Sequence, residues 1–341
     1  MERVPAVFII DDPPVNSAYL MRKQMEAAGK PLGEKDFFTR TYLLRWREME
    51  KSAIIPNAFF KKLAGWAVTE GVKGKCTLLA CPGGLGFLDD KVAGYSGEQL
   101  KELLDIFRND ITRNFDITPE ILTHTLALAL KTNQLLPQTE HEWMALQNEE
   151  TLTDYMAKGL QVLKNAGITA TGITQPCNYR GDFGLYSRAV LAAEKRVNKL
   201  GETYYFHDCN SEDKKVSSKI MLQDPEKNEY VVSIVSASRA DEPFWYTLYG
   251  EGDPEKLADY YISKDGKSGR FIDLLSTNSP LVFHAHGQTL YSNGSEKGFL
   301  SLQEVIRRMN KYLSSRIIWM KIGEFAAWNI RQQEKYAGLK R

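Results

Sequence analysis

Short apolar runs recur along the chain, separated by polar stretches with helical periodicity. Most runs are nearly continuous rather than alternating, which is typical of parallel strands buried on both faces. The pattern predicts strands at Ala6–Asp12, Cys76–Pro82, Ile121–Thr125, Thr169–Pro176, Thr203–Asp208, Tyr230–Ala237, Pro280–Gly287 and Arg316–Ile322.

Amphipathic stretches fill most of the gaps between these strands. Glu149–Asn165 has apolar residues at helical spacing, and Ser96 with Gln99 resembles a capping box at the start of a helix. The predicted helices are Ser96–Phe107, Glu149–Asn165, Leu185–Leu200, Leu302–Leu313 and Glu324–Gln333. Alternating strands and helices predict an α/β fold. A (β/α) barrel is favoured over an open dinucleotide-binding sheet, because no Gly-x-Gly-x-x-Gly follows the first strand.

Length and composition fit one barrel domain over residues 1–341, with loop elaborations at 30–56 and 238–279. A net charge of +1 provides no general attraction for nucleic acid or an anionic membrane. No apolar stretch approaches the roughly 20 residues of a membrane span, and no signal peptide is evident, so a cytoplasmic protein is expected. The four cysteines are scattered without a Cys-x-x-Cys pair, which argues against a cysteine zinc site.

The first apolar run ends in two carboxylates followed by two prolines. Proline has no N–H to continue a strand ladder, so Pro13 and Pro14 should end the strand. Side chains alternate along a regular strand, and Asp11 and Asp12 would then face opposite sides. Both carboxylates can reach one site only if the strand has already broken at Asp12.

Histidines gather at the ends of later predicted strands, namely His124, His207, His284 and His286. In a (β/α) barrel the carboxyl ends of the strands converge on one mouth, where catalytic groups come from several strands. Carboxylate and imidazole together suit zinc or another divalent ion, so we expect a hydrolytic metal site. His284 and His286 should face the same side, with His286 nearer the mouth.

Polar and aromatic residues in the loops after these strands are candidates for substrate binding. Aromatic rings there would suit stacking on a sugar. The candidates are Trp143, Asn178, Tyr179, Arg180, Asp208, Tyr291 and Asn293. His141, in a polar stretch, is interpreted as a surface or rim residue rather than a ligand.

Several segments resemble the polysaccharide deacetylase superfamily, the NodB-like carbohydrate esterases. The stretch 8–14 resembles the family's first motif, in which a strand ends Phe-Asp-Asp-Gly-Pro. His124-Thr125 resembles the start of its metal motif His-Ser/Thr-x-x-His, and the strand ending at His286 resembles its late Leu-x-His motif. The segments 116–124 and 286–294 are similar to a bacterial branch of this deacetylase-like group.

The resemblance implies a distorted seven- or eight-stranded (β/α) barrel. It also implies a divalent metal, usually zinc, and hydrolysis of an N-acetyl amide on an amino sugar. Transferred to this chain, Asp11 is the general base, Asp12 and His124 are metal ligands, and His286 or His284 is the general acid.

The chain departs from the family pattern at the next ligand. The second metal histidine of the family would fall at Leu128, which cannot bind a metal. Either a third ligand comes from elsewhere, with His207, His284 and His286 as the candidates, or the metal is absent. The family's glycine after the Asp pair is Pro13, and residues 175–180 replace its Arg-x-Pro-Tyr motif.

Three functions remain open at this point. The first is metal-dependent hydrolysis of an amide or ester on a carbohydrate, with an N-acetylated amino sugar as the expected substrate. The second is a metal-free glycoside hydrolase that pairs Asp11 or Asp12 with Asp208. The third is a degenerate barrel that only binds a saccharide or a protein. The oligomeric state is left open.

Overall fold

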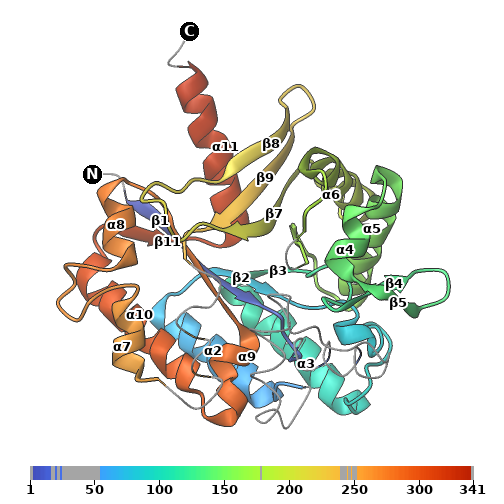
Figure 1. Cartoon of the computed structure of the whole chain (residues 1–341), viewed down its shortest axis with the longest axis horizontal. Helices are drawn as coiled ribbons and strands as arrows, with labels where there is room; N and C mark the ends of the chain where they lie inside the picture. Colours follow the sequence, from blue (N-terminus) through green and yellow to red (C-terminus); the bar gives the residue numbers. More distant parts are fainter. Residues whose placement is uncertain are drawn as a thin grey trace.

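The computed structural model describes residues 3–16, 20, 24, 54–176, 179–238, 244, 247 and 252–338. It shows a mixed α/β fold in which helices cover parallel β-structure (Figure 1). The first sheet has the order β10 (Leu281–His286), β1 (Val4–Asp11), β2 (Gly74–Thr77) and β3 (Phe115–Thr118), and β11 (Ile317–Trp319) also pairs with β1. All of these pairings are parallel. The α/β class expected from the sequence is confirmed.

A second sheet has the order β6 (Ile173–Thr174), β7 (Glu202–Cys209), β9 (Glu229–Ser236) and β8 (Lys219–Asp224). Strands β6, β7 and β9 are parallel, whereas β8 is an antiparallel edge strand. A small hairpin joins β4 (Leu126–Ala129) and β5 (Gln134–Thr139).

Single backbone hydrogen bonds link the two sheets at two places. The amide of Thr174 donates to the carbonyl of Pro119 at 2.8 Å, next to β3. The amide of Ala237, just after β9, donates to the carbonyl of Val282 in β10 at 2.6 Å. Strand pairing among the described residues does not by itself close the sheets into a barrel, so the barrel remains a prediction.

Helices pack around these sheets. Their bounds are α2 (Asn57–Glu70), α3 (Gly97–Asn109), α4 (Glu140–Ala145), α5 (Glu149–Asn165), α6 (Phe183–Val197), α7 (Pro254–Asp259), α8 (Arg270–Ser276), α9 (Gly287–Tyr291), α10 (Lys297–Leu313) and α11 (Ile322–Gly338). Short 3₁₀ turns lie at 82–84, 111–113 and 292–294. The predicted helix at Glu149–Asn165 has the observed bounds, and the capping box of Ser96 and Gln99 is present. Both predictions rested on residues that lie three or four positions apart in the sequence.

Strand β1 contributes to two hydrophobic clusters at once. Ala6, Phe8 and Ile10 pack in the larger cluster, which includes residues of α2, α3 and α10. Val7 and Ile9 point the other way, into a cluster with residues of β7, β9 and α11. Burial on both faces explains why the sequence of this strand is continuously apolar.

The predicted strand at Ile121–Thr125 is wrong. The strand of this region is β3, which ends at Thr118, and β4 begins only at Leu126. Ile121 and His124 have φ angles of +48° and +59°, which are incompatible with an extended ladder. The segment is instead a turn, and it carries His124.

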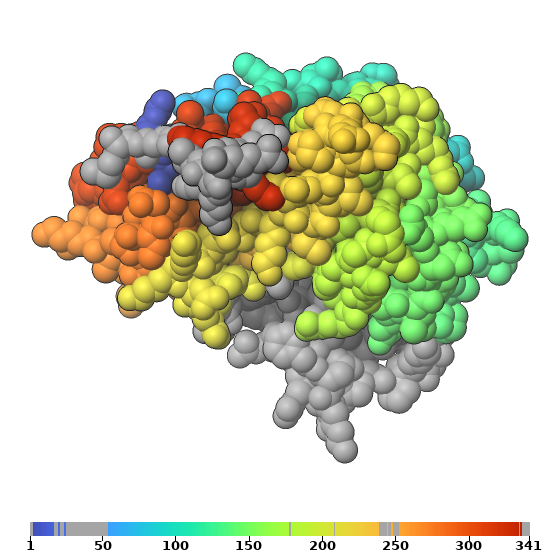
Figure 2. Space-filling view, turned by 90° about the horizontal axis from the view of Figure 1, so that it is seen from above, coloured from blue at the N-terminus to red at the C-terminus, as the bar shows by residue number. Residues whose placement is uncertain are grey.

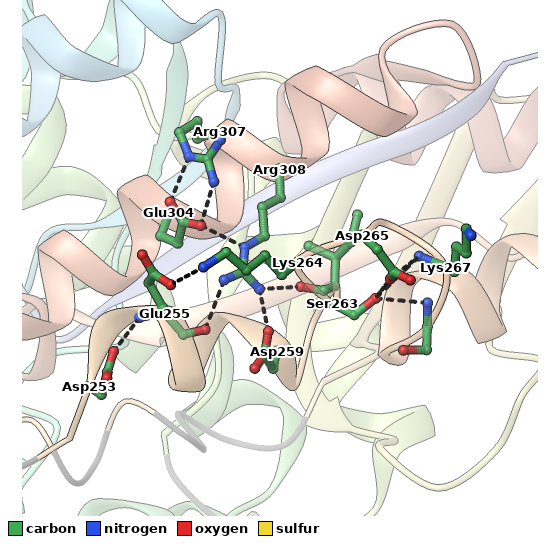
Figure 3. Close-up of polar contacts among 12 residues, drawn as sticks. Asp253, Glu255, Asp259, Ser263, Lys264, Asp265, Lys267, Glu304, Arg307 and Arg308 are labelled. Carbon is green, nitrogen blue, oxygen red and sulfur yellow. Dashed lines mark hydrogen bonds and ion pairs between the residues drawn. The ribbon is translucent and has the colours of Figure 1, made fainter.

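The two predicted elaborations are described only in part. Of residues 30–56, the structure describes 54–56. The second segment, 238–279, contains α7 and α8. The fully buried Arg308 of α10 fixes α7 by donating hydrogen bonds to Asp259 and to the backbone carbonyls of Glu255 and Ile262 (Figure 3).

The long helix α11 lies beside the β8–β9 hairpin, which is exposed on the face seen in Figure 2. The side-chain amide of Gln333 donates to Gln223 of β8 at 2.9 Å, and Phe325 and Ile330 belong to the cluster that holds Val7 and Ile9. Among the described residues, no helix combines the length and the apolar character needed to span a membrane.

Candidate metal centre

Strand β1 ends where the two carboxylates begin. Asp11 is the last residue of the strand, and Asp12 has a φ angle of +72°, so the ladder breaks between them. The bond between Pro13 and Pro14, which follow directly, is cis. Both carboxylates are buried, with 3% and 2% of their surface exposed. The expectation that the strand must break at Asp12 is confirmed.

The segment after β3 supplies two further groups, the carboxylate of Glu120 and the imidazole of His124. Glu140 lies beneath the turn at 121–125 and is almost fully buried. Its carboxylate accepts hydrogen bonds from the backbone amides of Leu122, Thr123 and His124 at 3.2, 3.0 and 2.8 Å. The hydroxyl of Tyr155 donates a fourth, at 2.8 Å. These bonds replace the strand ladder and hold the turn in shape.

Asp12, Glu120 and His124 converge into one group whose ligand atoms all lie within 4.8 Å of one another. Nε2 of His124 lies 3.3 Å from Asp12, and Nδ1 lies 3.0 Å from Glu120. The backbone amide of Asp12 donates to Glu120 at 3.0 Å, and Gln288 donates to Oδ2 of Asp12 at 2.8 Å. The residue after β1, two residues from the segment after β3 and Gln288 of α9 therefore meet at one point.

The electrostatics of the group reflect its burial. Burial raises the pKa of Asp12 to about 6, although His124 opposes the shift. For Glu120, burial acts to raise the pKa, but His124 and Lys75 together outweigh it and lower the pKa to about 2. Burial likewise acts to lower the pKa of His124, but Glu120 and Asp12 raise it to about 10. Without a cation, His124 is thus an imidazolium held between two carboxylates.

The donor set of this group fits a divalent cation. Oδ1 of Asp12 and Nδ1 of His124 are buried, and their close polar contacts are the ion-pair contacts within this group rather than well-formed hydrogen bonds. Buried polar atoms without well-formed hydrogen bonds are rare, and a missing ion is one explanation for them. Two carboxylates and one imidazole are ligands that divalent metals accept. The buried group could therefore bind a metal ion.

Asp11 points to a different partner. Its Oδ1 accepts a hydrogen bond from Nζ of Lys75 at 2.6 Å, in an ion pair that is fully buried. Burial raises the pKa of Asp11, and Lys75 opposes the shift. No pattern in the sequence indicated Lys75.

The two late histidines differ in their surroundings. His284 is buried, its Nδ1 lies 3.0 Å from the hydroxyl of Ser236, and burial lowers its pKa well below the usual value. His286 ends β10 in register with Asp11 and is half-buried. The two rings lie 5.7 Å apart, centroid to centroid, so they share a face as expected. His286 is therefore the better placed of the two to meet a substrate.

His207 lies apart from the metal group. Its ring packs against Phe183 of α6 at 4.5 Å and against Tyr205 at 5.8 Å. Glu120 is the third residue of the group, and the expectation that His207, His284 or His286 supplies a ligand stays a prediction. Glu120 precedes His124 by four residues, a spacing that could have identified it.

The candidate substrate-binding residues differ in their exposure. Tyr179 is buried and packs against Tyr186, so it belongs to the core. Trp143 is partly buried against Tyr155. Tyr291 is half-buried, while Arg180 and Asn293 are exposed. Asn178 and the side chain of Asp208 lie outside the described part of the chain, so the glycosidase pair with Asp208 stays untested.

Comparison with known proteins adds no identification. No protein-family model matches the chain, and no curated protein matches it either.

Proposed function

We propose that this chain is a divalent-metal-dependent hydrolase of the deacetylase type, acting on an amide or ester of a carbohydrate. The observation that carries the proposal is the buried group of Asp12, Glu120 and His124, with Asp11 and His286 beside it. We further propose that β1, β2, β3, β6, β7, β9 and β10 form a distorted barrel around this mouth. The two backbone hydrogen bonds that link the sheets, from Thr174 to Pro119 and from Ala237 to Val282, support that arrangement.

A divalent ion held by Asp12, Glu120 and His124, with zinc as our choice, would supply Lewis acidity that activates water and polarises a carbonyl group. To bind it, His124 must give up its proton. Gln288 keeps Asp12 oriented through its hydrogen bond to Oδ2.

The remaining chemistry belongs to residues of the chain. Asp11 accepts a proton from water as the water oxygen attacks the carbonyl carbon. His286 donates a proton to the leaving nitrogen or oxygen as the bond to the carbonyl carbon breaks. The products are a carboxylic acid and the free amine or alcohol, so atoms and protons balance. His284 is hydrogen-bonded to Ser236, and its ring packs against the ring of His286.

The test is the metal content of the purified protein, measured by elemental analysis after dialysis against zinc, nickel, cobalt or manganese. We expect close to one ion per chain and at least a tenfold loss of affinity in Glu120→Gln, because one of three ligands is removed. Glu142→Gln is the matched control, since Glu142 is an exposed residue nearby. Release of acetate from N,N′-diacetylchitobiose then tests the reaction class.

A wild-type protein that binds none of the four metals would overturn the proposal. The carboxylates would then have to be considered as a glycosidase pair or as part of a saccharide-binding pocket.

A further inference from the structure

Lys75 of β2 is one of the largest fully buried side chains among the described residues. It is in register with Ile9 of β1, whose side chain faces the cluster of β7, β9 and α11 residues. The ammonium group lies 4.9 Å from the ring centroid of Phe206, which belongs to the same cluster. The side chain of Lys75 thus extends toward the cluster of β7, β9 and α11 residues rather than toward solvent.

The polar contacts of this ammonium group join three strands. Nζ donates to Oδ1 of Asp11 in β1 at 2.6 Å and to the hydroxyl of Thr174 in β6. That hydroxyl lies 2.9 Å from the hydroxyl of Thr118 in β3. The result is a short polar chain through an otherwise apolar region, and it ends at Asp11.

Such a pair is a costly way to fill a core. Burying an ammonium and a carboxylate removes both from water, and their attraction often only offsets that cost. Apolar side chains of similar volume would pack at least as well, so packing alone does not explain Lys75. Its placement beside the candidate metal centre suggests a role in the chemistry.

The charges near the centre point to that role. Asp11, Asp12 and Glu120 bring three carboxylates into one buried region. A divalent ion and one ammonium group would balance these three when His124 is a neutral ligand, while the buried Glu140 nearby is bound by backbone amides and Tyr155. Lys75 supplies the ammonium group that contacts Asp11. The hydrogen bonds of the described residues do not join the Asp11 side chain to Asp12, Glu120 or His124.

We propose that Lys75 is a positioning residue that holds the Asp11 carboxylate beside the metal centre, in the orientation from which it accepts a proton from water. The proton that leaves the water goes to Asp11, and Lys75 neither gives nor takes one in this step. This inference rests on the proposed hydrolase function.

The experiment compares Lys75→Met and Lys75→Arg with the control Lys73→Met, a partly exposed lysine just before the same strand. Bound zinc, kcat and KM for acetate release from N,N′-diacetylchitobiose, and a crystal structure are obtained for each. In Lys75→Met we expect zinc to be retained and the Asp11 carboxylate to turn away. We expect kcat to fall at least about 100-fold, the scale of general-base catalysis, with KM within about threefold. The kcat of Lys75→Arg should be at least about tenfold higher than that of Lys75→Met.

A kcat of Lys75→Met within about threefold of wild type, or an unmoved Asp11 carboxylate, would overturn the inference. If Lys75→Met does not fold, Thr174→Val loosens Lys75 instead, and an unchanged kcat there would count equally against it. If the wild-type protein binds no metal and releases no acetate, the proposed function fails. The position of Asp11 in Lys75→Met still decides whether Lys75 holds it.

Discussion

Two candidate ligands, Asp12 and His124, are non-glycine residues in left-handed backbone conformations, with φ angles of +72° and +59°. Such conformations cost free energy and persist where surrounding contacts enforce them. Here the backbone amide of Asp12 is held by Glu120, and that of His124 by Glu140. Strained backbone is therefore present at the candidate centre, as it often is at functional sites, although other non-glycine residues of the described chain, such as Asn133 and Lys199, also have positive φ angles.

At the same scale, Leu128 occupies the position where the deacetylase family that the sequence resembles has its second metal histidine. Leu128 is buried and lines a cavity of about 420 Å³ with Cys81 and Tyr95, and none of the three candidate ligands lines that cavity. Leu128→His should leave zinc affinity within about threefold of wild type and destabilise the fold by about 1–3 kcal/mol, because it buries a polar ring. Zinc titration and urea unfolding provide the two values.

Leu128→Met is the matched control, since it nearly conserves volume and should cost less than about 1.5 kcal/mol. A Leu128→His protein that binds zinc more than tenfold tighter would show that the position still belongs to the metal centre.

At the scale of elements, helix α6 carries a buried carboxyl group on its core-facing side. Glu194 is fully buried, its Oε2 accepts a hydrogen bond from Asn198 at 2.8 Å, and its Oε1 has no hydrogen-bond partner. Burial raises the pKa of Glu194 to about 7, against the opposing effect of Asn198. The packing of α6 is therefore most favourable when this group is protonated.

The consequence is a pH dependence of stability. Because the folded pKa lies above the unfolded value, the folded protein binds the extra proton, and stability from this group is lost as pH rises from about 4.5 through 7. We expect the free energy of unfolding of Glu194→Gln, relative to that of wild type, to rise by about 2–3 kcal/mol between pH 5 and pH 8, at 1.36 kcal/mol per pKa unit. Urea unfolding at both pH values measures it.

Glu150→Gln, at an exposed position of α5, should show almost no such difference. An equal pH dependence in Glu194→Gln and wild type would mean that Glu194 ionises freely in the folded protein.

At the scale of the whole molecule, Arg308 connects α10 to the segment that holds α7. Its side chain is 1% exposed and donates to Glu304 at 2.6 Å and to Asp259 at 2.5 Å (Figure 3). Two further bonds go to backbone carbonyls of Glu255 and Ile262. This side chain therefore binds three residues of the segment that holds α7.

Arg308→Met should destabilise the fold by about 2–4 kcal/mol, because it leaves two backbone carbonyls and a carboxylate without their donor. The neighbouring Arg307 also binds Glu304 but is 57% exposed, so Arg307→Met should cost less than about 1 kcal/mol. Urea unfolding of the two variants compares them. Equal losses would contradict the anchoring role of Arg308.

Local signals in the sequence were enough for much of the fold. The apolar period of Glu149–Asn165 and the cap at Ser96 identified helices, because both depend on residues three or four apart. The run at the start of the chain identified β1 because both of its faces are buried. The strand predicted at Ile121–Thr125 failed since its backbone amides bind the distant Glu140, which no local pattern reveals.

The candidate site divides in the same way. The sequence by itself determined that β1 ends at two carboxylates, because prolines stop a ladder, and that His284 and His286 share a face, because strand side chains alternate. Only the tertiary structure decided that Glu120 joins Asp12 and His124, that Lys75 pairs with Asp11, and that His207 faces α6 instead. These contacts join residues from different strands and turns, and their geometry depends on how the chain packs rather than on spacing along it.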